Sequence, residues 1–134
     1  MDKFIDGIDL HLVSMQTLAF IGDSVYNVYI RTYLASKSNM QTGKLHTKSI
    51  KYVSAKGQAK TIDYLMDTLT EEEQLIYKRG RNTNINTVSK NVDVNQYKKS
   101  TGFEALIGYL YLSKNTQRLE DLISKSIDYI NKEE

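Results

Sequence analysis

Apolar residues recur along this chain mainly at helical spacing. Between Ser14 and about Ala35 they fall on most faces of a helix, which is typical of a central helix. Residues 103–111 carry a clean i, i+3, i+4, i+7, i+8 stripe, and a looser stripe over residues 44–69 predicts two helices that meet near Gly57. Because Pro is also absent, we expect an all-α helical bundle of roughly six helices.

Local signals predict where several of these helices begin and end. Thr70 and Glu73 form a T-x-x-E capping box, which predicts a short helix that runs to about Lys78. Thr116 is expected to cap the last helix. Residues 80–99 are polar, basic and rich in Asn, so we expect most of them to form a loop.

Length and composition indicate an ordinary globular protein. The 134 residues suit one domain, so residues 1–134 are expected to form a single unit. The absence of Cys excludes a disulfide framework and a Cys-based zinc site. Apolar stretches are interrupted well before membrane-spanning length, and the N-terminus lacks the plan of a signal peptide, so a cytoplasmic location is expected.

Positive charge is concentrated in two segments, although the net charge is only +2. Residues 36–60 contain six Lys and no acid, and residues 78–99 contain six Lys or Arg and one acid. Segregated positive charge favours a polyanionic partner such as nucleic acid. Two solvated Lys-rich faces explain the same distribution equally well.

Two carboxylates stand alone in apolar surroundings. Asp23 and Glu104 are each the only formally charged residue in a strongly apolar helical segment. A buried ionised carboxylate is costly unless it is paired or binds a metal ion. Gly22 precedes Asp23, and Gly108 follows Glu104 by one turn, so the two helices can approach closely. The two carboxylates are therefore predicted to converge as a candidate metal site.

Simpler structural roles remain open for both carboxylates. Glu104 is the fourth residue of a T-x-x-E sequence that begins at Thr101, so it is also a candidate capping-box residue. Asp23 is close in sequence to Tyr26 and Tyr29, whose hydroxyls are candidate hydrogen-bond partners in a core.

At this point four segments together resemble the ribonuclease III family. LAFIGDSVYNVY resembles its Phe-x-Gly-Asp signature, and STGFEALIGYLYLSK resembles its second signature. LHTKSIKYVSAKGQA and KRGRN extend the resemblance over residues 14–130. The chain is most similar to the Mini-III subgroup, which has one catalytic domain and no double-stranded-RNA-binding domain after it. Since the sequence ends at Glu134, no such domain is expected.

This resemblance implies an endoribonuclease that hydrolyses double-stranded RNA and leaves 5′-phosphate ends. Asp23 and Glu104 then become the catalytic residues and the ligands of Mg²⁺, for which Mn²⁺ can substitute. Further acidic positions of the usual ribonuclease III site are occupied here by Gln16, Ala19 and Thr101. Two protein carboxylates would leave most ligands to water and phosphate, so the number of metal ions stays open.

The resemblance also implies partners. The family works as a homodimer, and Phe20 matches a position whose ring inserts into the partner subunit; an ordinary core Phe is the alternative. The substrate implied is a precursor of large-subunit (23S) ribosomal RNA, with a ribosomal protein as a further candidate partner. A non-catalytic helical RNA-binding protein on the same fold is the competing function, and the presence of both carboxylates disfavours it.

RNA contacts are expected in both basic segments. Residues 78–99 would form a loop beside the active site, in which Arg79 and Arg81 flank Gly80 and fork onto phosphates where the backbone turns. A solvated loop whose charge serves solubility is the alternative. The candidate RNA-binding residues are Lys44, Lys48, Lys51, Lys78, Arg79, Arg81 and Asn82.

Overall fold

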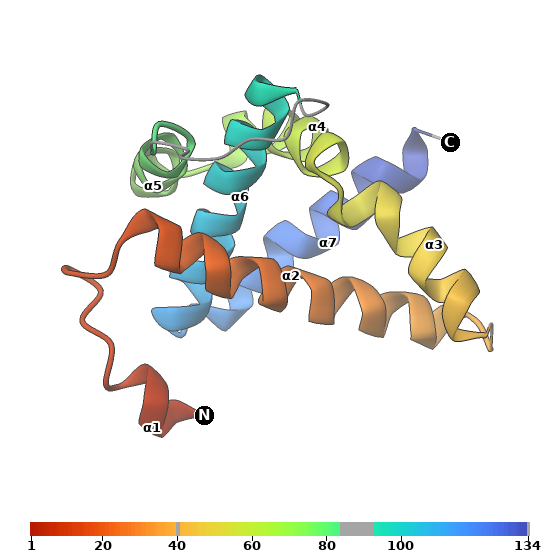
Figure 1. The fold of residues 1–134 in the computed structure, drawn as a ribbon, viewed down its shortest axis with the longest axis horizontal. Helices are drawn as coiled ribbons and strands as arrows, with labels where there is room; N and C mark the ends of the chain where they lie inside the picture. Colours follow the sequence, from red (N-terminus) through yellow and green to blue (C-terminus); the bar gives the residue numbers. More distant parts are fainter. Residues whose placement is uncertain (40, 84–92, 134) are drawn as a thin grey trace.

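The chain folds as a set of helices in the computed structural model, which describes residues 1–39, 41–83 and 93–133. Within these residues there is no strand, so the all-α prediction is confirmed (Figure 1). The helices are α1 (Asp2–Ile5), α2 (Met15–Lys37), α3 (Thr42–Val53), α4 (Ala55–Leu65), the 3-10 helix η1 (Met66–Thr68), α5 (Glu71–Arg81), α6 (Val94–Leu112) and α7 (Thr116–Lys132). Among the described residues, no helix is both long and apolar enough to cross a membrane.

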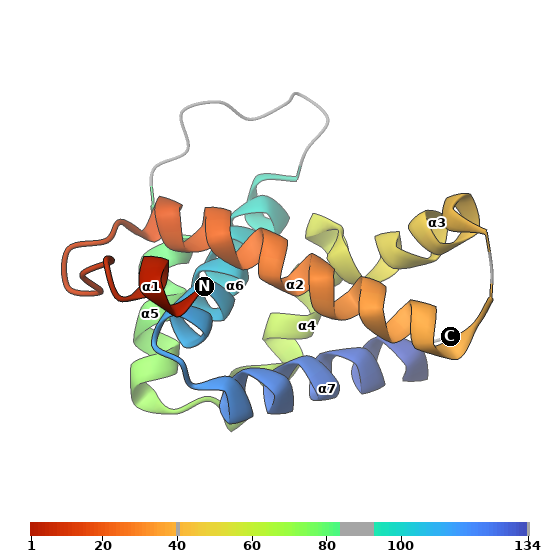
Figure 2. The same cartoon turned by 90° about the horizontal axis from the view of Figure 1, so that it is seen from below.

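Helix α6 is the centre of the bundle. Its residues from Phe103 to Leu110 are almost all buried, and α2, α4, α5 and α7 all pack against it. Figure 1 shows α2 crossing α6, with α4 and α5 on the two sides of the upper part of α6. In the view from below, α7 runs along one side of the bundle (Figure 2). This arrangement lets side chains from three helices meet at one stretch of α6.

Helix α2 packs against α6 as expected of a central helix, but not all of its apolar faces are buried. Its inner face is buried through residues such as Tyr26 and Ile30, and Tyr26 packs edge-on against Phe103 at 5.0 Å between ring centroids. The outer face, however, exposes Phe20 and Val28. An apolar pattern on most faces therefore reflects one face in the core and a second apolar face at the surface.

Two glycines let the backbones of α2 and α6 touch where the helices cross. A Cβ added to Gly22 would overlap the carbonyl oxygen of Glu104 and lie 2.7 Å from its carbonyl carbon. A Cβ on Gly108 would overlap the carbonyl oxygen of Leu18. Only glycine fits at both positions, and this close approach determines how Asp23 and Glu104 face each other.

Helix starts agree with the sequence in some places and differ in others. The Thr70–Glu73 capping box is confirmed, because each side chain bonds the other's backbone N–H. The α3–α4 junction lies at Ser54, whose hydroxyl accepts from the Gly57 N–H at 3.1 Å, and not at Gly57 itself. The residue before α7 is Asn115 and makes no side-chain cap, so the expected cap by Thr116 is wrong.

The expected loop over residues 80–99 is largely wrong within the described residues. Helix α5 continues to Arg81, and α6 already begins at Val94. Asp93 supplies the start signal, since its carboxylate accepts from the Gln96 N–H at 3.1 Å. The sequence pattern did not reveal the end of α5 and the start of α6, because helical turns that face the solvent carry polar side chains and no apolar stripe. Residues 84–92 lie outside the described residues.

Candidate active site

Asp23 and Glu104 come together where α2 crosses α6, as their spacing and glycine neighbours predict. The Glu104 carboxyl group is half-buried, the Glu104 backbone lies against Gly22 beside Asp23, and the two carboxyl groups interact directly. Asp23 itself is exposed, so the argument that an apolar helix must bury its carboxylate is wrong for this residue. Glu104 is therefore the half-buried carboxyl group of the pair, and Asp23 is the one that faces the solvent.

The environment of Glu104 disfavours its charged form. Burial has the largest effect, the neighbouring Asp23 adds to it, and together they raise the pKa of Glu104 to about 9. Within the described residues, no Lys or Arg forms an ion pair with either carboxylate. A cation between the two groups would favour their ionised forms, and the ionised pair would offer the charge and the oxygen donors that suit Mg²⁺.

The simpler roles considered for these carboxylates are not what the structure contains. Glu104 lies in the middle of α6 and is not a capping residue. Asp23 is hydrogen-bonded by Asn27, whose Nδ2 donates to the Asp23 carbonyl oxygen at 2.8 Å and to its Oδ1 at 3.3 Å. The hydroxyl of Tyr29 donates to Glu120 instead. Neither carboxylate is thus explained as an ordinary capping or core hydrogen-bonding group.

The site has two carboxylates within the part of the chain that the structure describes. There, no three His, Asp or Glu side chains come close enough to share a metal ion. Gln16 is exposed, Ala19 is buried, and the Thr101 hydroxyl donates to the Tyr97 carbonyl oxygen of its own helix at 3.0 Å. A metal ion held here would keep most of its ligands as water or phosphate oxygens.

Sequence reasoning missed two residues that contact this site. Gln58 of α4 is fully buried, and its Nε2 donates to Glu104 Oε2 at 3.4 Å. The Ser100 hydroxyl donates to Gln58 Oε1. A signal was available, because Gln58 falls at i, i+4, i+7 spacing with Ile62 and Leu65 on an apolar stripe. A lone amide on such a stripe indicates a buried polar contact.

Of the predicted RNA-binding residues, Lys78, Arg79 and Arg81 lie in the last turn of α5 and not in a loop. Gly80 is part of that helix, and a Cβ there would lie 2.8 Å from the Cβ of Ala105 in α6. The expected backbone turn at Gly80 is therefore wrong. Arg81 stacks over Tyr77 at 5.6 Å, and its Nε donates to Asn82 Oδ1 at 3.2 Å, whereas Lys78 and Arg79 are exposed.

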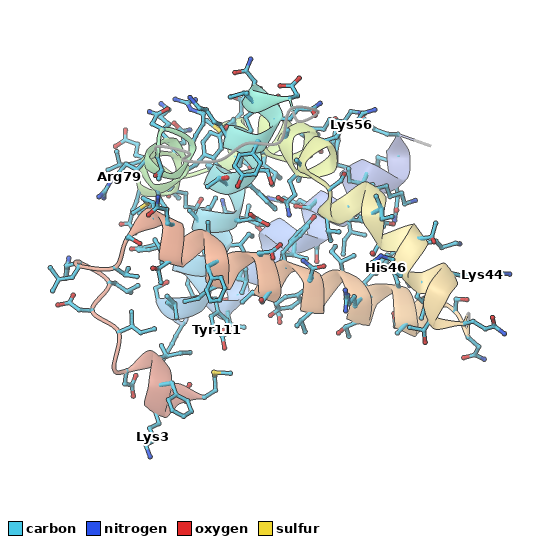
Figure 3. The ribbon with its side chains drawn as sticks, viewed as in Figure 1. Lys3, Lys44, His46, Lys56, Arg79 and Tyr111 are labelled. Carbon is cyan, nitrogen blue, oxygen red and sulfur yellow. The ribbon has the colours of Figure 1, made fainter. Side chains whose placement is uncertain are left out.

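The second predicted group lies on α3, away from the basic residues at the end of α5. It consists of Lys44, Lys48 and Lys51. Figure 3 shows Lys44 at the far end of α3, whereas Arg79 and Lys56 lie on opposite sides of the upper part of α6. Lys56 is exposed and is two residues from Gln58 on α4. Exposed basic side chains of α4 and α5 thus lie on the two sides of α6, the helix that carries Glu104.

Phe20 is a surface residue, and its alternative role in the core is wrong. Its side chain is 78% exposed on α2. It borders an apolar groove formed by α1, α2 and α6, which includes Phe4, Val28 and Tyr111. A large exposed apolar surface of this kind is typical of an interface with another protein.

The chain is similar in sequence and in fold to proteins of one nuclease family. The ribonuclease III domain model matches residues 16–115. A Mini-ribonuclease 3 from Streptococcus pneumoniae is 50% identical over 92% of this chain and 98% of its own length, and one from Staphylococcus aureus is 48% identical over 91% and 92%. A crystal structure of a Fusobacterium nucleatum protein superposes with a TM-score of 0.81 at 31% identity, covering 90% of this chain and 96% of that one. The chain therefore belongs to the ribonuclease III family, in its Mini-ribonuclease III group, and is an endoribonuclease.

Proposed function

We propose that this protein cleaves double-stranded RNA with the help of Mg²⁺, and that Asp23 and Glu104 are its catalytic residues. One observation carries the proposal: the two carboxylates converge at the α2–α6 crossing, and no described basic side chain neutralises them. A divalent cation would favour the ionised forms of both groups, which then provide negative charge and hard oxygen ligands for it.

The chain's own residues have separate tasks in this reaction. Asp23 and Glu104 would hold the metal ion, and Asn27 keeps Asp23 in place through its two hydrogen bonds. When bound, Mg²⁺ supplies an activated water and neutralises the charge that develops on the scissile phosphate. The exposed position of Asp23 leaves room for a phosphate backbone to approach the pair.

The substrate backbone would run across the carboxylates between the basic residues of α5 and α4. Lys78 and Arg79 are exposed on one side, and Lys56 is exposed on the other. A-form RNA is recognised mainly through its phosphates, its 2′-hydroxyls and its shape, which suits separate Lys and Arg side chains on helices. Precursors of 23S ribosomal RNA are the proposed natural substrate, and a ribosomal protein that presents them is a further candidate partner.

A homodimer would place one such site against each strand of the duplex. The exposed Phe20 and the apolar groove beside it support this arrangement, since a second copy of the chain would cover both. One aromatic anchor that enters a pocket commonly contributes a large share of the free energy of association.

Cleavage of a long RNA duplex in Mg²⁺, with EDTA as the control, tests the proposal. Asp23→Asn and Glu104→Gln are each expected to abolish cleavage while RNA binding survives, because each removes one ligand charge. Asp67→Asn is the matched control, since Asp67 is an exposed carboxylate in η1, and it should cleave like the unaltered protein. Normal turnover by Asp23→Asn or Glu104→Gln would refute the assignment of these residues.

A further inference from the structure

A chain of two hydrogen bonds through the buried Gln58 ends on one of the paired carboxylates. Gln58 has no exposed surface, and each end of its amide has a partner on α6. Nε2 donates to Glu104 Oε2 at 3.4 Å, and Oε1 accepts from the Ser100 hydroxyl. A buried amide without such partners would cost several kcal/mol. Both polar ends of Gln58 are thus directed at a single helix.

An ionised Glu104 fixes which way the amide faces, and the Ser100 hydroxyl supports that orientation by donating to the amide oxygen. Rotating the amide by half a turn would point its oxygen at a carboxylate oxygen, and two acceptors would then repel each other. The Ser100 hydroxyl lies one turn before Glu104 on α6 and is buried, and it donates to the amide oxygen in the observed orientation. The N–H group is therefore held toward Glu104.

We propose that Gln58 is a positioning residue for Glu104, held in its orientation by Ser100. The amide N–H occupies one oxygen of the Glu104 carboxylate and keeps the group turned toward Asp23. This inference rests on the proposed function, in which Glu104 binds the metal ion. Gln58 does not contact RNA or metal in this role; it acts through the carboxylate that does.

The chemistry of the donor explains why an amide suits this place. A Lys at position 58 would orient Glu104 equally well, but its charge would neutralise the carboxylate and compete with a cation. A neutral N–H donor fixes the direction of the carboxylate and leaves its formal charge available. Partners behind metal ligands commonly change metal affinity or activity by roughly 10- to 100-fold when they are removed.

The test compares Gln58→Met with Thr61→Val in the complete protein. Met has similar length and no donor. Thr61 is equally buried on the same helix, and its hydroxyl donates to the Gly57 carbonyl oxygen at 2.8 Å without contact to the carboxylates. Thr61→Val therefore reproduces the loss of one buried hydrogen bond in α4, and the comparison isolates the bond to Glu104.

Two readouts separate positioning from general destabilisation. Binding of Mn²⁺ to the RNA-free protein, followed by electron paramagnetic resonance, should weaken about 10- to 100-fold in Gln58→Met and remain unchanged in Thr61→Val. Single-turnover cleavage should slow by a similar factor in Gln58→Met, with KM for the duplex unchanged, and partial recovery is expected at high Mg²⁺.

Ser100→Ala keeps the amide and removes the hydroxyl that orients it, so it should shift both readouts in the same direction by a smaller factor. This variant decides the question if Gln58→Met does not fold. Mn²⁺ affinity and cleavage that match Thr61→Val in both variants would overturn the inference. Two different results would refute the proposed function itself. These are cleavage by the unaltered protein without a metal ion and cleavage by Asp23→Asn.

Discussion

The most direct test of the site's architecture is a single added methyl group, in Gly22→Ala. Gly22 lies next to Asp23 at the α2–α6 crossing, and its Cα faces the backbone of Glu104. The new Cβ would overlap the Glu104 carbonyl oxygen and lie 2.7 Å from the carbonyl carbon and 2.8 Å from the Gly108 nitrogen. These neighbours are helix backbone, so no flexible side chain can move aside.

The expected magnitude follows from how far the helices must separate. An ordinary contact begins near 3.4 Å, so the carbonyl carbon requires α2 and α6 to move apart by about 0.7 Å, and the closer carbonyl oxygen requires more. Overpacking of this kind costs about 1–3 kcal/mol, and the overlap with rigid backbone places Gly22→Ala at the upper end of that range. The helix preference for Ala over Gly returns at most about 1 kcal/mol, so the unfolding free energy should fall by about 2–3 kcal/mol. Because displacements near 1 Å can cost about 100-fold in rate, cleavage should fall by at least tenfold.

Chemical denaturation and single-turnover cleavage of an RNA duplex measure the two effects. Gly43→Ala is the matched control, since it is also a helical Gly→Ala change and, beyond its chain neighbours and its own helix backbone, no described atom lies within 4 Å of the added Cβ. It should increase stability by up to about 1 kcal/mol and leave cleavage unchanged. Cleavage by Gly22→Ala at the rate of Gly43→Ala would refute the claim that this close contact sets the spacing of Asp23 and Glu104.

Three further outcomes are expected. Glu73 is 5% exposed and accepts two hydrogen bonds from Arg118, which hold its pKa below 4.5. The stability that this ion pair adds is present above about pH 4.5 and is lost as the pH falls through the lowered pKa. Glu73→Gln should therefore lower the unfolding free energy in urea by about 2 kcal/mol at pH 7 and weaken the dependence of that free energy on pH in the acid range. Phe20→Ala should weaken dimerisation by about 2 kcal/mol or more in sedimentation without changing monomer folding, and an undisturbed dimer at low concentration would count against the proposed interface. Arg79→Ala with Arg81→Ala should weaken binding to all duplexes and flatten the plot of log affinity against log salt by up to about two units, whereas an unchanged slope would assign these residues to solubility.

Short-range features of this protein were predictable from sequence. The Thr70–Glu73 capping box involves groups three residues apart, so its geometry depends on one helical turn and little else. The apolar stripe from Phe103 to Tyr111 predicted a helix for the same reason. Asp23 and Glu104 stood out because each is the only charge in an apolar segment, and that contrast does not depend on the fold.

Features that depend on which surfaces meet could not be predicted in this way. An apolar residue such as Phe20 gives the same pattern whether its face is buried within the chain or exposed at the surface, and only the packed bundle decided that it is exposed. The first turns of α6 were hidden because their side chains are largely polar and partly exposed, so they add no apolar periodicity.

The sequence by itself determined the helices that carry an apolar stripe, the two isolated carboxylates and the glycines beside them, because these follow from the residues' own chemistry and helical spacing. The tertiary structure decided that Gly22 rests on the Glu104 backbone and that Gln58 reaches Glu104 across 46 residues of chain. It also placed Lys56 of α4 and Arg79 of α5 on opposite sides of the upper part of α6 (Figure 3). The physical reason is that close packing joins groups distant in sequence, and their separation and orientation depend on every contact between the helices that carry them.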